Sequence, residues 1–160
     1  WKEARGEEMA LKLMYITNRS DVAIVAEKYG VDRIWVDLET LGKEERQKGM
    51  NTVKSNHTVD DVRRIKPLLS TSEMLVRVNP WNKNSVQEIN DVVSAGADMI
   101  MLPMWKSVAE VTNFLSVVDG RCRTTLLLED RKWSVWMKCW KTVVWMRFIS
   151  VLMTYTFPMA

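Results

Sequence analysis

Four polar side chains at the ends of short apolar segments have types that suit chemistry on a carboxylic acid: Glu39, Arg77, Asn79 and Glu129. Arg77 interrupts an apolar segment, and a guanidinium there can hold a carboxylate through two parallel hydrogen bonds. Glu129 closes an apolar segment, where an unpaired carboxylate is costly and a hard divalent cation would satisfy it. An alternative reading stays open for both residues. Arg77 is also compatible with a structural ion pair, and Glu129 with a position beside a helix N-cap.

The elements that must position these side chains alternate along the chain. The apolar segments have strand length and are almost continuously apolar, which is typical of strands buried on both faces of a parallel sheet. They are LKLMYIT (11–17), DRIWVDL (32–38), EMLVRVN (73–79), DMIMLPM (98–104) and RTTLLLE (123–129).

The stretches between the apolar segments carry helix-start signals and stop at Gly30, Gly96 and Gly120. Ser and Thr before an amphipathic stretch favour a helix start, and a Glu three residues later completes a capping box. The expected caps are Ser20, Thr58, Ser85 with Glu88, and Ser107 with Glu110. The pattern predicts an α/β fold with about five parallel strands.

Two architectures fit this pattern, an open doubly wound sheet and a (β/α)8 barrel that is only partly present. The segment after the first strand, YITNRSD, is not a Gly-rich phosphate loop, which counts against a nucleotide-binding sheet. A complete barrel needs roughly 250 residues, so a chain of 160 residues would supply about five of its eight units.

The segments VDLET (36–40), VRVNPW (76–81), GADMIMLPM (96–104) and LLLE (126–129) together resemble the HpcH/HpaI aldolase and citrate lyase family. The resemblance covers about residues 10–129. It implies a TIM barrel and a divalent metal ion, Mg²⁺ or Mn²⁺. It also implies that a C–C bond is made or broken beside a pyruvate-type enolate, in a small 2-keto-acid or citrate-like substrate. A homo-oligomer is the expectation for the full-length family.

The resemblance also assigns roles to individual residues. Glu129 matches the metal-ligand Glu, Arg77 matches the Arg that binds the substrate, and Glu39 matches an acidic residue that supports the site or positions a water. Asn79, Pro103 and Met104 would contact the substrate.

Two departures from the family pattern affect the expected mechanism. Thr40 stands where the aldolase branch has its His base, and a Gly-x-x-Asp-Leu turn that carries the second metal ligand has no match.

His57 is expected to be a solvated residue before the Thr58 cap, and Trp81 and Trp105 are expected to pack or to form lids.

The last thirty residues differ in composition from the rest of the chain. Residues 131–160 hold four of the eight Trp and four of the eleven Met, and no Asp, Glu or Gly. Residues 1–129 carry 18 basic and 19 acidic side chains, so the net charge of +3 comes from the tail and does not indicate a nucleic-acid partner. We therefore expect an incomplete barrel domain over 1–129 and a separate tail over 130–160.

A shifted reading frame explains the tail. If the last base of each codon is read with the first two of the next, codons containing Trp and Met determine several residues. Trp136–Met137 gives Asp, and Trp140–Lys141 gives Glu. With permitted codons elsewhere, the shifted frame reads ECVDEVLEDGGVDEIHIGLNDLHL, which is a helix, a Gly stop, a strand and the Gly-Leu-Asn-Asp-Leu turn. The chain as written is then expected to have little or no activity.

The alternative function is non-catalytic, with the basic hydrophobic tail docking on a membrane surface or a partner. A transmembrane helix over 133–157 is unfavourable, because Lys138, Lys141 and Arg147 would each cost about 2.5–3.5 kcal/mol near its centre. Two cysteines form neither a metal motif nor a disulfide framework, so a reducing, cytoplasmic location is the expectation.

Overall fold

The computed structural model describes residues 11–41 and 56–128, and the backbone of 149–153. Within these residues six strands form one sheet: β1 (Met14–Ile16), β2 (Arg33–Asp37), β3 (Glu73–Arg77), β4 (Met99–Leu102), β5 (Arg123–Leu128) and β6 (Ile149–Met153). The helices are α1 (Ser20–Lys28), α3 (Val59–Ile65), α4 (Ser85–Ser94) and α5 (Val108–Val118), with a short 3-10 helix η1 (Lys66–Leu68) after α3. Each predicted strand is present over slightly shorter bounds, and each predicted helix is present.

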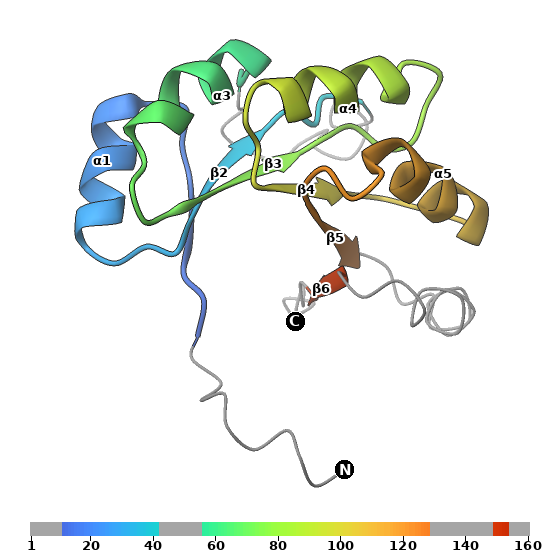
Figure 1. Ribbon diagram of the computed structural model, residues 1–160. Coiled ribbons are helices and arrows are strands. Elements are labelled where there is room, and N and C mark those ends of the chain that lie inside the picture. Colours follow the sequence, from blue (N-terminus) through green and yellow to red (C-terminus); the bar gives the residue numbers. More distant parts are fainter. Residues whose placement is uncertain (1–10, 42–55, 129–148, 154–160) are drawn as a thin grey trace, which may run out of the picture.

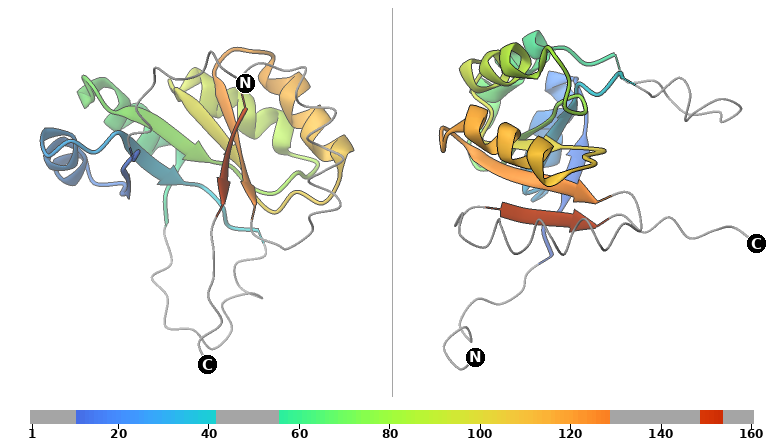
Figure 2. Two further views of the ribbon diagram at one scale, coloured as in Figure 1. Left: turned by 90° about the horizontal axis from the view of Figure 1, so that it is seen from below. Right: turned by 90° about the vertical axis from the view of Figure 1, so that its right-hand side faces the viewer.

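The order of the strands decides between the two architectures. They lie in the sequence order β1-β2-β3-β4-β5-β6, and every neighbouring pair is parallel. A doubly wound sheet would reverse its strand order at a switch point and carry helices on both faces. Figures 1 and 2 show the four α-helices together on one face of the sheet. The fold is therefore that of a partial (β/α)8 barrel, and the described strands do not close it.

The core lies on both faces of the sheet. Alternate side chains of β2, β3, β4 and β5 point toward the helices, among them Ile34, Val36 and Val76, and they pack with apolar helix residues such as Ile89 and Phe114. A second cluster lies on the other face, which would be the barrel interior, and contains Leu75, Met99, Met101 and Leu127. Because both faces are apolar, the strands read as continuous apolar segments rather than as alternating ones.

The helix starts confirm the predicted caps at Thr58 and Ser107, whereas Glu110 does not complete the capping box predicted with Ser107, since its Oε2 accepts the N–H of Lys106. Thr58 and Asp61 form a reciprocal capping box at α3, and the Ser107 hydroxyl accepts from the N–H of Glu110 at 3.2 Å. The prediction for Ser20 is wrong, because α1 begins at Ser20 itself and its buried hydroxyl has no hydrogen-bond partner among the residues that the structure describes.

The predicted capping box of Ser85 and Glu88 is also wrong. The residue before α4 is Asn84, which makes no side-chain cap, and the Ser85 hydroxyl accepts from the N–H of Asn82 at 2.9 Å. Glu88 instead bonds to Asn79 at the end of β3. The helix is correctly predicted, while the partners of its first turn are set by tertiary contacts.

The turn before β4 needs glycine for two physical reasons. Gly96 has a φ of +96°, and a Cβ there would lie 3.1 Å from Cγ of Lys66. Lys66 approaches closely because its Nζ binds Asp98 at 2.6 Å, and the same Asp98 oxygen accepts the N–H of Met74 at 2.7 Å. This contact ties η1, β3 and β4 together at the amino ends of the strands.

Strand β6 belongs to the stretch 130–160 that the composition sets apart. It pairs in parallel with β5, with Thr124 opposite Ile149 and Leu128 opposite Met153. The pairing extends the sheet by one strand beyond the five that the sequence pattern predicts (Figure 2). In the described part of the chain, no helix has the length and apolar character needed to cross a membrane. Most of 133–157 lies outside the described residues.

Candidate functional site

Polar side chains gather where β2 and β3 end. Asp37 is the last residue of β2 and Arg77 is the last residue of β3, and the two stand opposite each other in the strand register. Glu39 follows two residues after Asp37, and Asn79 two residues after Arg77. The site is therefore at the carboxyl ends of the strands, which is where (β/α)8 barrels carry their catalytic groups.

Arg77 is held by two buried carboxylates. Its Nε lies 2.8 Å from Oδ1 of Asp37 and its Nη2 lies 2.9 Å from Oδ2, while its Nη1 is 3.3 Å from Oε2 of Glu39. Asp37 is 3% exposed and Glu39 is 1% exposed. The Asp37 contact has the two-pronged geometry that fixes the plane of a guanidinium. Arg77 is thus held in a fixed orientation between the ends of β2 and β3.

The ring of Trp35 packs against the same guanidinium. The ring centre of Trp35 lies 5.1 Å from Cζ of Arg77, within the range of a cation–π contact. Its indole N–H is buried and finds no hydrogen-bond partner within residues 11–41 and 56–128. Trp35 and Arg77 share the face of the sheet opposite the helices, so the indole lies under the charged cluster on the inner side.

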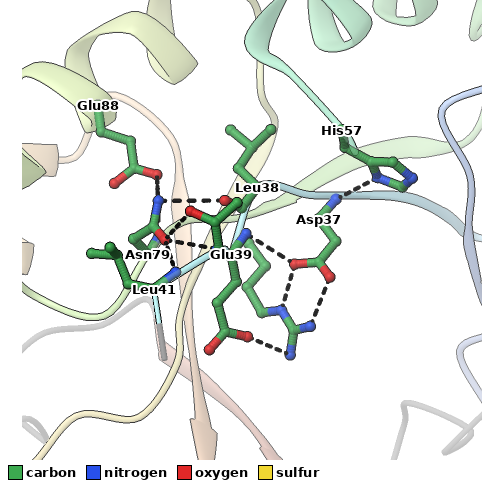
Figure 3. Close-up of polar contacts among 9 residues, drawn as sticks. Asp37, Leu38, Glu39, Leu41, His57, Asn79 and Glu88 are labelled. Atoms are coloured by element: carbon green, nitrogen blue, oxygen red, sulfur yellow. Dashed lines mark hydrogen bonds and ion pairs between the residues drawn. The ribbon is translucent and has the colours of Figure 1, made fainter. Parts of the chain in front are cut away.

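Asn79 connects the ends of the two strands. Its Oδ1 accepts from the N–H of Thr40 at 2.9 Å, from the Thr40 hydroxyl at 3.3 Å and from the N–H of Leu41 at 3.0 Å. Its Nδ2 donates to the carbonyl of Leu38 at 3.3 Å and to Oε1 of Glu88 at 2.8 Å. Figure 3 shows the amide between the turn after β2 and Glu88. The structure thus gives Asn79 a connecting role, and direct contact with a substrate stays a prediction.

Glu88 reaches the site from the first turn of α4. Its Oε1 accepts both the backbone N–H of Asn79, at 3.1 Å, and the side-chain amide. Burial raises the pKa of the Glu88 carboxyl above its usual range, and the two N–H donors of Asn79 reduce that rise without cancelling it. The sequence reading assigns this residue to a helix cap, so its place at the site is new information from the structure.

His57 is not the solvated residue that the sequence suggests. It is partly buried, and its Nδ1 accepts the backbone N–H of Asp37 at 2.9 Å (Figure 3). This contact requires an unprotonated Nδ1, so a neutral ring carries its proton on Nε2. His57 therefore continues the hydrogen bonding of β2 past the end of β1.

Pro103 and Met104 lie directly after β4. Pro103 is buried, and Met104 has a φ of +48°, a left-handed conformation that is uncommon for a residue with a large side chain. Trp105 follows and donates its indole N–H to the carbonyl of Leu127 at 3.1 Å, while Trp81 packs against the core. Both tryptophans are packing residues, and the substrate contacts predicted for Pro103 and Met104 stay predictions.

The predicted metal ligand Glu129 lies outside the described residues, directly after the end of β5. Within the described residues, no group of three or more His, Cys, Asp and Glu side chains could hold a metal ion. Among the described residues, the carboxylates that contact Arg77 are those of Asp37 and Glu39. These two carboxylates by themselves therefore do not constitute a metal site.

The sequence profile of the HpcH/HpaI aldolase/citrate lyase family matches residues 12–125 of this chain. The chain belongs to this family. The resemblance carried by VDLET, VRVNPW and GADMIMLPM is thereby confirmed. The HpcH/HpaI family implies aldolase or lyase activity on a small molecule, and it is generally dependent on a divalent metal ion. No curated protein sequence gives a significant match.

Solved structures support the fold of this HpcH/HpaI chain. Phosphoribosyl anthranilate isomerase from Thermotoga maritima matches with a TM-score of 0.57 at 12% identity, over 92% of this chain and 63% of the isomerase. A mandelate oxidase solved with benzaldehyde matches with a TM-score of 0.57 at 14% identity, over 89% of this chain and 48% of the oxidase. Tryptophan synthase from M. tuberculosis matches with a TM-score of 0.52 at 15% identity, over 73% of this chain and 54% of the synthase chain. The chain thus spans 48–63% of the length of these enzymes, and at these identities the likeness concerns the fold alone.

The sequence did not predict the contacts that three residues make in the site: Asp37, His57 and Glu88. For Asp37 a signal exists, since a carboxylate ends one buried strand and an arginine ends the next. For Glu88 the true partner is nine residues back along the chain, and a local capping pattern hides it. For His57 the contact spans twenty residues and has no local signature.

Proposed function

We propose that this chain is the amino-terminal part of a metal-dependent carbon–carbon lyase or aldolase that acts on a 2-keto-acid or citrate-like substrate. The reaction in the cleavage direction breaks the bond between C3 and C4 of a 4-hydroxy-2-keto acid. The hydroxyl proton leaves, an aldehyde forms, and C3 takes up a proton to give pyruvate. The observation that carries the proposal is the buried Asp37–Arg77–Glu39 cluster at the carboxyl ends of β2 and β3, in a chain of this family.

In this proposal Arg77 binds the carboxylate of the substrate. Asp37 holds the Nε and Nη2 edge of the guanidinium, which keeps its plane fixed before a substrate arrives. A fixed donor avoids part of the ordering cost of binding. Glu39 lies beside Nη1 and supports Arg77 or positions a water. Asn79, Pro103 and Met104 would border the substrate from β3 and β4.

The family and the chemistry of Glu129 favour a divalent cation next to this cluster. A divalent cation would supply electrostatic stabilisation for the charge that develops when the bond breaks. We propose Glu129 as a ligand and Mg²⁺ or Mn²⁺ as the ion, on the strength of the family and of the chemistry of a carboxylate after an apolar strand.

The remaining proposals concern the molecule as a whole. Because a Gly-x-x-Asp-Leu turn is absent from the sequence, we expect the 160-residue chain to turn over substrate slowly or not at all. We also propose a homo-oligomer for the full-length protein and a small-molecule substrate as its partner. A basic, Trp-rich tail that docks on a membrane or partner remains the alternative, and liposome co-sedimentation separates the two.

The experiment compares Arg77→Lys with Arg33→Lys in the protein expressed with its reading frame shifted after codon 130. Arg33 is a matched control, since it lies at the other end of the strand that ends at Asp37 and pairs with Glu73 at 3.0 Å. Pyruvate release from a panel of 4-hydroxy-2-keto acids is measured. Arg77→Lys is expected to raise KM at least tenfold, because Lys keeps the charge but loses the two-pronged contact with Asp37 that fixes the direction of the proposed substrate-binding group. An equal effect of both variants would contradict the substrate role of Arg77.

A further inference from the structure

Glu39 is placed by a turn whose backbone is tied to the neighbouring strand. The N–H of Leu38 donates to the carbonyl of Arg77 at 2.9 Å, and the N–H groups of Thr40 and Leu41 donate to Oδ1 of Asn79. Glu39 stands between these anchored residues, and its own N–H donates to Oδ1 of Asp37 at 3.1 Å. The direction of the buried Glu39 side chain therefore depends on where the Asn79 amide lies.

The orientation of the Asn79 amide depends in turn on its donors and acceptors. Two backbone N–H groups face Oδ1, and a carbonyl and a carboxylate face Nδ2. A flipped amide would set N–H against N–H on one side and oxygen against oxygen on the other. Of the groups facing Nδ2, the Glu88 carboxylate gives the shorter contact, 2.8 Å against 3.3 Å for the Leu38 carbonyl.

The Glu88 carboxylate also strengthens the bonds that Asn79 makes on its other side. A hydrogen bond from Nδ2 to a carboxylate polarises the amide and makes Oδ1 a better acceptor, as in other hydrogen-bonded chains. The same Oε1 accepts the backbone N–H of Asn79, so the side chain and the backbone of this residue are held by one oxygen atom. Glu88 therefore acts on the turn after β2 without contacting it.

We propose that Glu88 is a positioning residue of the active site: through Asn79 it fixes the turn 38–41 and thereby the place of Glu39 beside Arg77. The link joins α4 to the end of β3, and the end of β3 to the turn after β2 (Figure 3). Both β2 and β3 end in the charged cluster. The functional meaning of Glu39 rests on the proposed function. The hydrogen-bonded link itself does not, and the test addresses the link first.

The test uses ¹⁵N-labelled 160-residue chain and the amide signals of Thr40 and Leu41. Glu88→Ala is expected to shift both signals and to speed their hydrogen exchange at least tenfold, because Oδ1 of Asn79 loses its fixed direction. Glu88→Gln keeps an oxygen that can accept both Asn79 donors, so it should restore exchange to within about threefold of wild type. Glu88→Asp keeps the charge in the first turn of α4 but shortens the reach, so it should resemble Glu88→Ala.

Glu110 provides a matched control in the same chain. It occupies the first turn of α5, accepts the N–H of Lys106 at 2.7 Å, and makes no hydrogen bond to Asn79 or to the turn 38–41 in the described part of the chain. Glu110→Ala should leave the Thr40 and Leu41 signals unchanged. Unchanged signals in both Glu88→Asp and Glu88→Ala would overturn the proposal, and so would failure of Glu88→Gln to restore them. If Glu88→Ala does not fold, the contrast between Asp and Gln at this position decides the matter.

Turnover of the frame-shifted protein then separates this inference from the proposed function. If the lyase assignment holds, Glu88→Asp should lower kcat at least tenfold while KM changes less than threefold, because Arg77 keeps its contact with Asp37. If the amide signals respond as expected but no keto acid is cleaved, the link stands and the proposed function is wrong.

Discussion

The guanidinium of Arg77 is joined to the carboxylate of Asp37 by two parallel hydrogen bonds, 2.8 Å and 2.9 Å long, between the last residues of neighbouring strands. The side chains are 13% and 4% exposed, so the pair is largely withdrawn from water. The Nε–Nη2 edge of Arg77 is therefore already used by Asp37.

Loss of the Asp37 charge is expected to destabilise the fold. Asp37→Asn leaves the Arg77 cation buried with a weaker partner, and the expected loss in the free energy of unfolding is roughly 3 kcal/mol. Asp60→Asn is the control, because Asp60 and Arg63 form an exposed pair that contributes at most about 1 kcal/mol. Urea unfolding of both variants measures the difference. Similar losses in the two variants would contradict a buried, structurally important pair.

Two hydroxyl residues at helix starts should respond differently to removal. Thr58→Ala removes a side chain that accepts from the N–H of Asp61, and should lower stability by about 1 kcal/mol. Ser20→Ala removes a buried hydroxyl that has no partner in the described part of the chain, so stability should stay the same or rise slightly. Thermal or urea unfolding distinguishes them, and a larger loss for Ser20→Ala would refute the observed start of α1.

Glu27 should make stability depend on pH in the acid range. Burial alone would raise its pKa, but the N–H groups of Ser70, Thr71 and Ser72 all donate to its Oε1 and lower the pKa below 4.5 overall. Because the folded-state pKa lies below the unfolded one, the stabilisation is complete above pH 4.5 and is lost as the pH falls through the folded-state pKa.

The measurement compares the unfolding free energy of wild type with that of Glu27→Gln between pH 7 and pH 2. The difference should be largest at neutral pH and should shrink below pH 4.5. A gap that stays constant across this range would show that the carboxylate charge has no part in holding the loop before β3.

The architecture could be read from the sequence because its signals are local. Continuous apolar segments such as 98–104 fit strands buried on both faces, and Gly96 and Gly120 mark helix ends through their positive φ. The periodic pattern alone left a barrel and a doubly wound sheet open, the family resemblance predicted the barrel, and the strand order confirms it. Strand β6 was not predicted either, since its segment lacks the turns and caps that mark the other strands.

The site could be read only in part, for the same reason. Glu39 and Arg77 were correctly expected to lie at strand ends on one edge of the sheet, and the structure brings them to 3.3 Å. The partners that orient them come from distant parts of the chain. Glu88 carries a capping pattern but bonds elsewhere, and His57 looks solvated but binds the backbone of Asp37.

The coding DNA is expected to explain the composition of the tail. Read one base out of phase after about codon 130, it should continue as an acidic helix and then a strand that ends in Gly-x-x-Asp-Leu. The shifted strand would lie between the codons of Met146 and Met153, the same stretch that contains β6. Sequencing the DNA is the measurement, and stop codons soon after codon 130 in both other frames would rule the frameshift out.

The central claim, a metal-dependent lyase built on this half-barrel, is tested most directly by pyruvate release from 4-hydroxy-2-keto acids with and without metal. The protein is expressed with its frame shifted after codon 130, treated with EDTA and then supplied with Mg²⁺ or Mn²⁺. We predict that EDTA abolishes pyruvate release, that either ion restores it, and that Glu129→Ala lowers it at least a hundredfold at saturating metal, because one remaining carboxylate does not hold a labile ion against water. Pyruvate release that is unchanged by EDTA, or that survives Glu129→Ala at the wild-type rate, would contradict the account.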